Sequence, residues 1–441
     1  MGDRFGTDGI RGHVGSEITA DLALALGRAV GDRFGGPGRA VLVGRDTRRS
    51  GEMLSAALTA GLVDAGTDVV DLGIVTTPCL VHASGEAGAP AIMVSASHNP
   101  APDNGLKVIL AGRKLDDAAE DDLESLLDDP SAIAHRPNLE LGRLRPVRDE
   151  IAAYQRHLAE IAGDAFVGLR LGIDCANGSA SRAGPGLFRS LGAEVTVLFD
   201  APDGTNINEG CGSTHPERLA ETVAAAGLDI GLAFDGDADR LIAVDELGQL
   251  VDGDAVMGIC ALARLAEGTL RNDLLVVTVM SNGGLERIVR QAGGTIVRTP
   301  VGDRHVLEAM ERHDAVLGGE QSGHIIFRDR ASTGDGLLTG IELVRAVRAA
   351  GRPLSKLAGA IPRLPQVMIN SAVSRRDDWQ DDPELTAAIE RATGEMGDRG
   401  RILVRPSGTE PKIRIMVEGD DAIEIERIAR ELSTLAEARL N

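Results

Sequence analysis

The chain has 441 residues, and at roughly 100–200 residues per domain this length predicts more than one domain. Hydrophobic residues make up 43% and charged residues 26%, as in ordinary globular proteins, so an intrinsically disordered chain is excluded. The net charge of −21 repels nucleic acid and anionic membranes, and an aromatic content of 2% is too low for stacking on nucleic acid. Without a long apolar run or an apolar amino-terminal stretch, the chain is expected to be cytoplasmic, with no membrane partner.

The first part of the chain, residues 1–150, alternates short apolar runs with helical patterns, as βα units around a mainly parallel sheet do. A helix is expected after Ser50, and strands are expected over 40–46, 68–73, 91–97 and 106–110. Residues 129–146 contain three prolines and little periodicity, which predicts an irregular connection.

Residues 151–364 repeat this alternation of strands and helices, and residues 365–441 do not. In residues 151–253, a bridging helix precedes expected strands over 169–175, 194–199 and 230–235 and a hairpin over 240–250. In residues 254–364, strands over 274–280, 295–300 and 315–319 lie between amphipathic helices. Residues 365–441 read as strand, helix, two strands and a closing helix over 422–440, which is an α+β pattern. The sequence therefore predicts four domains, 1–150, 151–253, 254–364 and 365–441.

An acidic loop follows the expected strand over 230–235. Asp235, Asp237 and Asp239 are spaced two apart, so in an extended loop their carboxylates can point to one side and offer hard oxygen ligands to Mg²⁺. A calcium-binding EF-hand loop is the competing reading, but its sixth position needs glycine and here is Arg240. A solvated acidic turn remains the structural alternative. Placement at a strand end favours the metal site.

A second polar motif, Ser95–Pro100, follows another expected strand and contains Ser97 and His98. Serine needs activation or a prior phosphoryl group to take part in group transfer. Adjacent residues are not expected to face each other as nucleophile and base, and the G-x-S-x-G elbow of α/β-hydrolases is absent. Lys107, one of only four lysines, lies on the next strand, where its ammonium could hold a phosphate or exchange a proton. A plain turn is the alternative reading.

Further motifs suit a sugar phosphate. Glu320 and Ser322 are two apart and flanked by glycines, so both can face one way and bind neighbouring sugar hydroxyls, and His324 suits acid–base work. The segment 405–411, RPSGTEP, combines an arginine, two hydroxyls and turn amides into a nest for a phosphate that does not react. Arg11 in the glycine-rich opening is a candidate cation. A β-turn and a structural histidine are the alternatives. Together these motifs favour an interdomain cleft that moves a phosphoryl group on a phosphorylated sugar.

The same motifs resemble a known family. FGTDGIRG, SASHNP with NGLK, DGDADR, GEQSGH and RPSGTEP occur in this order along the whole chain. Each resembles a signature of the α-D-phosphohexomutases. The opening FGTDGIRG, the GEQSGH form and TVMSN at 278–282 are most similar to the branch that acts on glucosamine phosphates. The resemblance implies three related α/β domains with mixed sheets and a C-terminal α+β domain, distantly like TATA-binding proteins, around a central cleft.

The resemblance also implies an activity and a role for each motif residue. The activity is interconversion of glucosamine 6-phosphate and glucosamine 1-phosphate, a step towards UDP-N-acetylglucosamine. The four domains would be, in order, the phosphoserine, metal-binding, sugar-recognition and phosphate-binding closing domains. Ser97 would be the phosphoserine, and its phosphate would bind Mg²⁺ together with Asp235, Asp237 and Asp239. Substrate would be bound by Glu320, Ser322, Arg405, Ser407, Gly408 and Thr409, and catalysis would also use Lys107, His324, Arg11 and Arg240.

The resemblance further implies cofactors and partners. One Mg²⁺ per chain is expected, with glucosamine 1,6-bisphosphate as intermediate and activator, a small phosphosugar as substrate and a separate phosphate donor that first loads Ser97. A homodimer is compatible with it. Ala101-Pro102 stand where this branch usually has aromatic residues. Residues 301–304 lack the histidine of the phosphomannomutase/phosphoglucomutase branch, which favours the glucosamine branch.

Other activities remain open at this stage. A phosphoglucomutase or phosphomannomutase would use the same chemistry. A metal-dependent sugar phosphatase would need no second phosphate nest, and a non-catalytic sugar-phosphate sensor would not need both Ser97 and the three aspartates.

Overall fold

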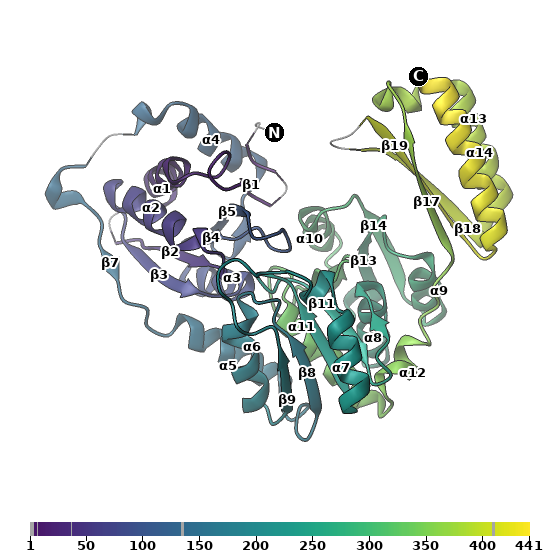
Figure 1. Ribbon diagram of the computed structural model, residues 1–441, viewed down its shortest axis with the longest axis horizontal. Helices are drawn as coiled ribbons and strands as arrows, with labels where there is room; N and C mark the ends of the chain where they lie inside the picture. Colours follow the sequence, from purple (N-terminus) through teal and green to yellow (C-terminus); the bar gives the residue numbers. More distant parts are fainter. Residues whose placement is uncertain (1–3, 7, 37, 134–135, 408–410) are drawn as a thin grey trace. The chain divides into compact units, whose positions relative to one another are not determined.

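The computed structural model describes residues 4–6, 8–36, 38–133, 136–407 and 411–441. The chain forms two compact units, which are described separately (Figure 1). The first comprises Met1–Thr278 and Ile296–Ala360, and the second comprises Val279–Thr295 and Ile361–Asn441. Among the described helices, none has both the length and the apolar character needed to cross a bilayer.

The first sheet has the strand order β1-β5-β4-β2-β3-β7, with β6 paired to β5. Strands β4, β2, β3 and β7 run parallel, while β5 is antiparallel to β1, β4 and β6. The strands are β1 Ile10–His13, β2 Val41–Arg45, β3 Val69–Ile74, β4 Pro90–Val94, β5 Asp103–Leu110, β6 Arg113–Lys114 and β7 Leu144–Arg145, and the helices are α1 Ala20–Phe34, α2 Ser50–Asp64, α3 Thr77–Ala87 and α4 Asp117–Asp128. The stretch 129–146, predicted as an irregular connection, contributes β7, because Leu144 pairs with Val69 at the sheet edge.

Close packing around this sheet explains why its elements form where they do. All five residues of β4 are buried, as expected for a strand covered on both faces. Helices α1 and α2 approach closely because glycines face each other: a Cβ on Gly27 would lie 2.3 Å from the carbonyl oxygen of Leu58, and one on Gly61 would lie 2.2 Å from that of Leu24. The Thr19 side chain accepts from the Leu22 amide and so caps α1.

Two further sheets complete the first unit. One has the order β12-β11-β10-β8-β9 and the other the order β14-β13-β15-β16. The strands are β8 Arg170–Asp174, β9 Glu194–Leu198, β10 Ile230–Phe234, β11 Leu241–Asp245, β12 Leu250–Val251, β13 Leu274–Thr278, β14 Thr295–Thr299, β15 Leu317–Gly319 and β16 Ile325–Phe327. The helices are α5 Glu150–Ala162, α6 Ala180–Ser190, α7 Glu217–Ala226, α8 Gly253–Ala266, α10 Asp303–Arg312, α11 Gly336–Ala350 and α12 Leu354–Ala358. Both sheets mix parallel and antiparallel pairs, because each contains a hairpin, β10–β11 or β15–β16, beside parallel strands.

The second unit contains helix α9, Gly283–Gln291, and an antiparallel sheet of order β17-β19-β18. Its other elements are β17 Gln366–Ala372, β18 Gly400–Pro406, β19 Lys412–Gly419, α13 Pro383–Met396 and α14 Ala422–Leu440. Helices α13 and α14 lie side by side over one face of the sheet and enclose its apolar core (Figure 1). The predicted fold class, three α/β domains followed by an α+β domain, is confirmed, whereas the boundaries 1–150, 151–253, 254–364 and 365–441 stay predictions.

Candidate active site

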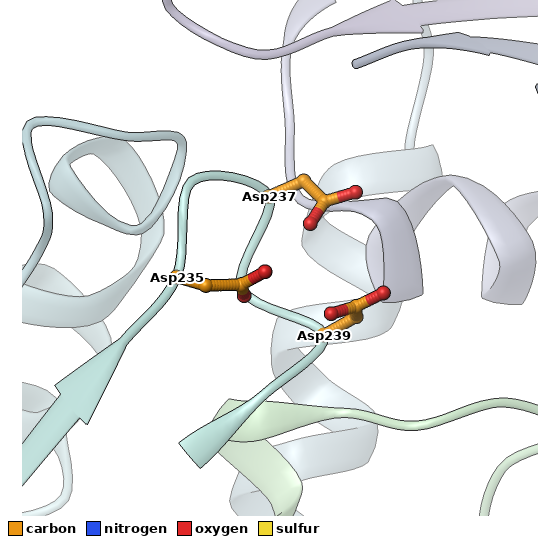
Figure 2. Close-up of side chains that lie close together, drawn as sticks. All are labelled: Asp235, Asp237 and Asp239. Atoms are coloured by element: carbon orange, nitrogen blue, oxygen red, sulfur yellow. The ribbon is translucent and has the colours of Figure 1, made fainter. Parts of the chain in front are cut away.

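The acidic loop joins β10 to β11 in the first unit. Its three carboxylates, from Asp235, Asp237 and Asp239, gather on one side of the loop (Figure 2), with one oxygen of each within 4.8 Å of the others. Ala238 has a φ of 59°, and this left-handed residue turns the loop between Asp237 and Asp239. All three aspartates are buried. Burial, followed by the charges of Asp239 and Asp237, raises the pKa of Asp235 well above its ordinary value.

Two carboxylate oxygens of this loop have no hydrogen-bond donor among the described residues. Oδ1 of Asp237 and Oδ1 of Asp239 are buried and accept no hydrogen bond from the described residues. A buried acceptor without a partner is costly, so such atoms in a native site call for an explanation. Converging carboxylate oxygens are the ligands that Mg²⁺ and Ca²⁺ prefer. The donor set therefore fits a hard divalent cation.

Ser97 follows β4 and faces the acidic loop. Its Oγ donates to Oδ2 of Asp235 at 2.5 Å, although the two residues are 138 positions apart. Ser97 has a φ of 51°, a left-handed conformation that is rare for a non-glycine residue and is typical of strained functional loops. This conformation brings the Nδ1 atom of His98 to 3.3 Å from the serine Oγ, so the expectation that these neighbours do not face each other is wrong. Burial, followed by Arg240 and Arg11, lowers the pKa of His98 to about 4, and its imidazole is neutral near pH 7.

A fully buried arginine holds the serine loop. The guanidinium of Arg48 donates to the carbonyl oxygens of Ser97 at 3.0 Å, Asn99 at 2.8 Å, Pro100 at 2.5 Å and Asp103 at 3.0 Å. It also pairs with Asp46 at 2.9 Å, and neither side chain of this pair is exposed. Because one rigid group satisfies four loop carbonyls, the backbone around Ser97 is fixed before any ligand binds.

The two candidate acid–base groups each contact one aspartate of the acidic loop. The ammonium of Lys107 donates to Oδ2 of Asp237 at 2.8 Å. Nδ1 of His324 lies 3.6 Å from Oδ2 of Asp239. Burial acts to lower the pKa of His324, but the charge of Asp239, its hydrogen bond to the ring and the charge of Asp303 together outweigh burial, so the pKa of His324 is raised. Lys107 comes from the first sheet and His324 from the β15–β16 loop, yet both reach the same group of carboxylates.

The candidate cations Arg11 and Arg240 are half-buried in the same unit. Each has an Nε atom that is buried and has no hydrogen-bond partner among the described residues. Arg240 lies 3.9 Å from Asp239, and Arg11 is bonded to Asp8. Both charges act on His98, the neighbour of Ser97, and unused guanidinium donors are suited to a phosphate group.

The candidate sugar-reading residues lie in the loop between β15 and β16. Glu320 is half-buried, and its Oε1 accepts from the Gly302 amide at 3.1 Å. Ser322 is exposed and donates to Oε2 of Glu320 at 3.4 Å. Gly323 has a φ of 93°, and a Cβ there would lie 2.2 Å from the Leu241 carbonyl oxygen, so the loop packs directly on β11. Both polar side chains thus extend from a rigid turn.

The candidate phosphate-binding residues belong to the second unit. Arg405 pairs across the β18–β19 ladder with Arg414, and neither has an ion-pair partner among the described residues. Burial, followed by the charge of Arg414, lowers the pKa of Arg405. Like charges placed directly opposite are unfavourable, so this pair is suited to an anion. Ser407 follows β18, while Gly408 and Thr409 lie outside the described residues.

The sequence alone did not identify several residues of this site. Asp8, Lys114 and Asp303 connect the candidate acid–base groups, and Arg48 and Arg414 support the serine loop and the arginine pair. One signal was present: Lys114 is one of only four lysines in a chain with 46 basic residues. Arginines are too numerous here for Arg48 or Arg414 to stand out.

Comparison with known proteins identifies the class that this fold and site define. Four models of the phosphoglucomutase/phosphomannomutase family match in order: alpha/beta/alpha domain I over residues 2–133, domain II over 151–248, domain III over 252–364 and the C-terminal domain over 368–435. The chain belongs to this family. Among solved structures, a phosphoglucomutase/phosphomannomutase family protein from Burkholderia thailandensis is similar, with a TM-score of 0.83 and 28% identity over 98% of this chain and 97% of that chain.

Within the family, the chain is similar over its full length to phosphoglucosamine mutases. It is 51% identical to phosphoglucosamine mutase of Symbiobacterium thermophilum over 445 residues, which cover 99% of each chain. It is 50% identical to phosphoglucosamine mutase of Moorella thermoacetica over 441 residues, again covering 99% of each. The resemblance inferred from the sequence motifs is therefore confirmed.

Proposed function

We propose that this chain interconverts glucosamine 6-phosphate and glucosamine 1-phosphate through a phosphorylated Ser97. The observation that carries this proposal is the 2.5 Å contact between Ser97 Oγ and Asp235, because it joins a buried hydroxyl to a group of carboxylates suited to a divalent cation. The full-length similarity to phosphoglucosamine mutases supports the choice of sugar. The two unpartnered oxygens of Asp237 and Asp239 support a single Mg²⁺ per chain.

The first half of the proposed reaction loads the sugar. A separate donor first phosphorylates Ser97, and the phosphoryl group then passes to the free hydroxyl of the bound sugar phosphate. The bond between phosphorus and Ser97 Oγ breaks, a bond to the sugar oxygen forms, and the hydroxyl proton goes to the unprotonated form of Lys107 or His324. The product is glucosamine 1,6-bisphosphate. Mg²⁺ held by the three aspartates would offset the charge of the phosphoserine, about −1.5 to −2 near neutral pH.

The second half reverses the transfer on the other end of the sugar. The bisphosphate reorients, Ser97 Oγ attacks the phosphate that was unreactive before, and the released sugar oxygen takes the proton back. We assign the sugar hydroxyls to Glu320 and Ser322, and the reacting phosphate to Arg11 and Arg240, whose unused donors suit it. The phosphate that is not reacting is assigned to Arg405, Arg414, Ser407, Gly408 and Thr409. In this proposal, the predicted domains 1–150, 151–253, 254–364 and 365–441 carry these tasks in order, in a cytoplasmic enzyme.

The test is turnover of glucosamine 6-phosphate with Mg²⁺ and a trace of glucosamine 1,6-bisphosphate, followed by intact-protein mass. The wild-type chain is expected to form glucosamine 1-phosphate and to gain the mass of one phosphoryl group. Ser97→Ala is expected to lose both while keeping its thermal unfolding midpoint. Ser55→Ala is the matched control, because that hydroxyl is buried in α2 and has no hydrogen-bond partner in the part of the chain that the structure describes.

Three results would contradict the proposal. The first is substantial turnover by the Ser97→Ala variant. Release of inorganic phosphate without isomerisation would favour a phosphatase. Faster turnover of glucose or mannose 6-phosphate than of glucosamine 6-phosphate would favour the phosphoglucomutase/phosphomannomutase alternative.

A further inference from the structure

Seven side chains of the first unit form a continuous series of alternating charges. The series begins and ends at the acidic loop and passes through both candidate acid–base groups. We refer to it as the charge chain, and its members in order are Asp237, Lys107, Asp8, Lys114, Asp303, His324 and Asp239.

The first half of the charge chain runs from Asp237 to Lys114. The Lys107 ammonium lies 2.8 Å from Oδ2 of Asp237 and 3.0 Å from Oδ2 of Asp8. The other oxygen of Asp8 is bonded to the Lys114 ammonium. Asp8 also bonds Arg11, so one carboxylate collects three cations.

The second half runs from Lys114 to Asp239. The Lys114 ammonium is bonded to Oδ2 of Asp303, which lies 3.5 Å from Nε2 of His324. The opposite ring nitrogen of His324 faces Asp239. Burial acts to raise the pKa of Asp303, but Lys114 and His324 hold it below its ordinary value, so this carboxylate is ionised. Lys114 is thus the cation at the middle of the charge chain.

Lys114 is not needed merely to hold β6 and α10 together. It lies in β6 of the first sheet, and Asp303 begins α10, which packs on the third sheet. Other polar pairs also join α10 to elements around the first sheet: Arg113 of β6 with Glu311 at 2.6 Å, and Arg304 with Asp117 of α4 at 2.7 Å. Lys114 belongs to the charge chain, whereas Arg113, its neighbour in the same short strand, pairs with Glu311 outside it. Side-chain exposure of 25% for Lys114, 17% for Asp8 and 15% for Asp303 places these contacts where solvent screening is weak.

We propose that Lys114 is a positioning residue for the mutase reaction, whose ammonium bridges Asp8 and Asp303 and so holds Lys107 and His324 at the reacting oxygens. This inference rests on the proposed function, in which one proton is taken from a sugar hydroxyl and later returned. Without Lys114, the cations that the described residues leave on Asp8 are Lys107 and Arg11, and the one they leave on Asp303 is His324. Each carboxylate then draws its remaining partner away from the acidic loop. A displacement of about 1 Å at a reacting group can cost on the order of 100-fold in rate.

The test compares Lys114→Met, Lys114→Arg and Arg113→Met in the full chain, with kcat and KM for glucosamine 6-phosphate measured separately. Lys114→Met is expected to lower kcat by about 10- to 100-fold while KM stays within about threefold, because Glu320 and Ser322 are untouched and Arg11 keeps its bond to Asp8. Lys114→Arg keeps a cation between the two carboxylates and is expected to recover most of the lost kcat. Arg113→Met loses a polar pair of the same contact and is expected to keep the wild-type kcat.

Several outcomes would overturn the inference. One is a Lys114→Met variant with the kcat of Arg113→Met, and another is a Lys114→Arg variant as slow as Lys114→Met. If Lys114→Met does not fold, the isosteric Asp303→Asn variant decides, because it removes the charge that Lys114 pairs with. A fall of about tenfold or more in its kcat at constant KM supports the inference, and an unchanged kcat overturns it. Absence of turnover in the wild-type chain would instead refute the proposed function.

Discussion

Replacing the buried Arg48 tests how the serine loop is held. In Arg48→Met the side-chain volume is largely kept, but four carbonyls each lose one donor and Asp46 loses its ion-pair partner. Asn208 still donates to the carbonyl oxygens of Ser97 and Asn99, so the main loss is the buried ion pair. Removing one partner of a buried pair leaves an uncompensated charge and costs about 3–5 kcal/mol. The free energy of unfolding should therefore fall by about this amount, which is more than 100-fold in the folding equilibrium.

The measurement is urea denaturation followed by circular dichroism, with Arg28→Met as the matched control. Arg28 pairs with Asp64 at 2.7 Å, but the two side chains are 28% and 31% exposed. A partly exposed pair is worth about 0–1 kcal/mol, so this control should change stability little. The double variant Arg48→Met/Asp46→Asn should lose less than the sum of its single variants, since both charges are then gone.

The same substitution has a pH dependence whose sign follows from Asp46. Burial already raises the pKa of Asp46 despite the opposing charge of Arg48, so losing Arg48 raises it further. A carboxyl whose pKa is higher in the folded state destabilises the fold when it ionises. The stability lost in Arg48→Met should therefore shrink as the pH falls through the folded-state pKa of Asp46. A loss equal to that of Arg28→Met, or one that grows at lower pH, would refute this reasoning.

Two further changes test the metal loop and the α1–α2 contact. Asp237→Asn removes one carboxylate of the loop and should weaken apparent Mg²⁺ binding by at least about tenfold, read from the Mg²⁺ dependence of turnover and of the thermal unfolding midpoint; an unchanged Mg²⁺ dependence would count against a metal at this loop. Gly61→Ala places a Cβ against the Leu24 carbonyl oxygen and should cost about 1–3 kcal/mol in chemical denaturation. Gly186→Ala in α6, where a Cβ meets nothing within 4 Å, should be neutral or stabilising, and equal losses in both variants would contradict the packing argument.

Local patterns were sufficient for much of the fold and for the individual motifs. The helix over 422–440 was predicted at the bounds that the structure has, and the hairpin after the acidic loop forms as β11 and β12. These elements depend on the periodicity of apolar residues within short windows, and they form wherever that periodicity meets a core. Strand β7 was missed, because two exposed residues beside prolines show no strand pattern and pair only when β3 presents a free edge.

Local sequence patterns could not predict which motif residues lie close together in the folded chain. Ser97 and Asp235 end strands of two different sheets, and their hydrogen bond depends on how those sheets pack in the first unit. The approach of His98 to Ser97 depends on a left-handed backbone at Ser97, which the surrounding loop imposes. No spacing in the sequence relates Lys114 to Asp303, which is 189 residues further along the chain.

By itself, the sequence determined the order of the elements, the family and the chemistry available at each motif, because these depend on residue types at short spacing. Only the tertiary structure decided that Lys107, Lys114 and His324 lie on one charge chain and that Arg48 secures the serine loop. The physical reason is that ion pairs and hydrogen bonds between distant segments depend on strand order and sheet packing, to which no local window of the sequence is sensitive.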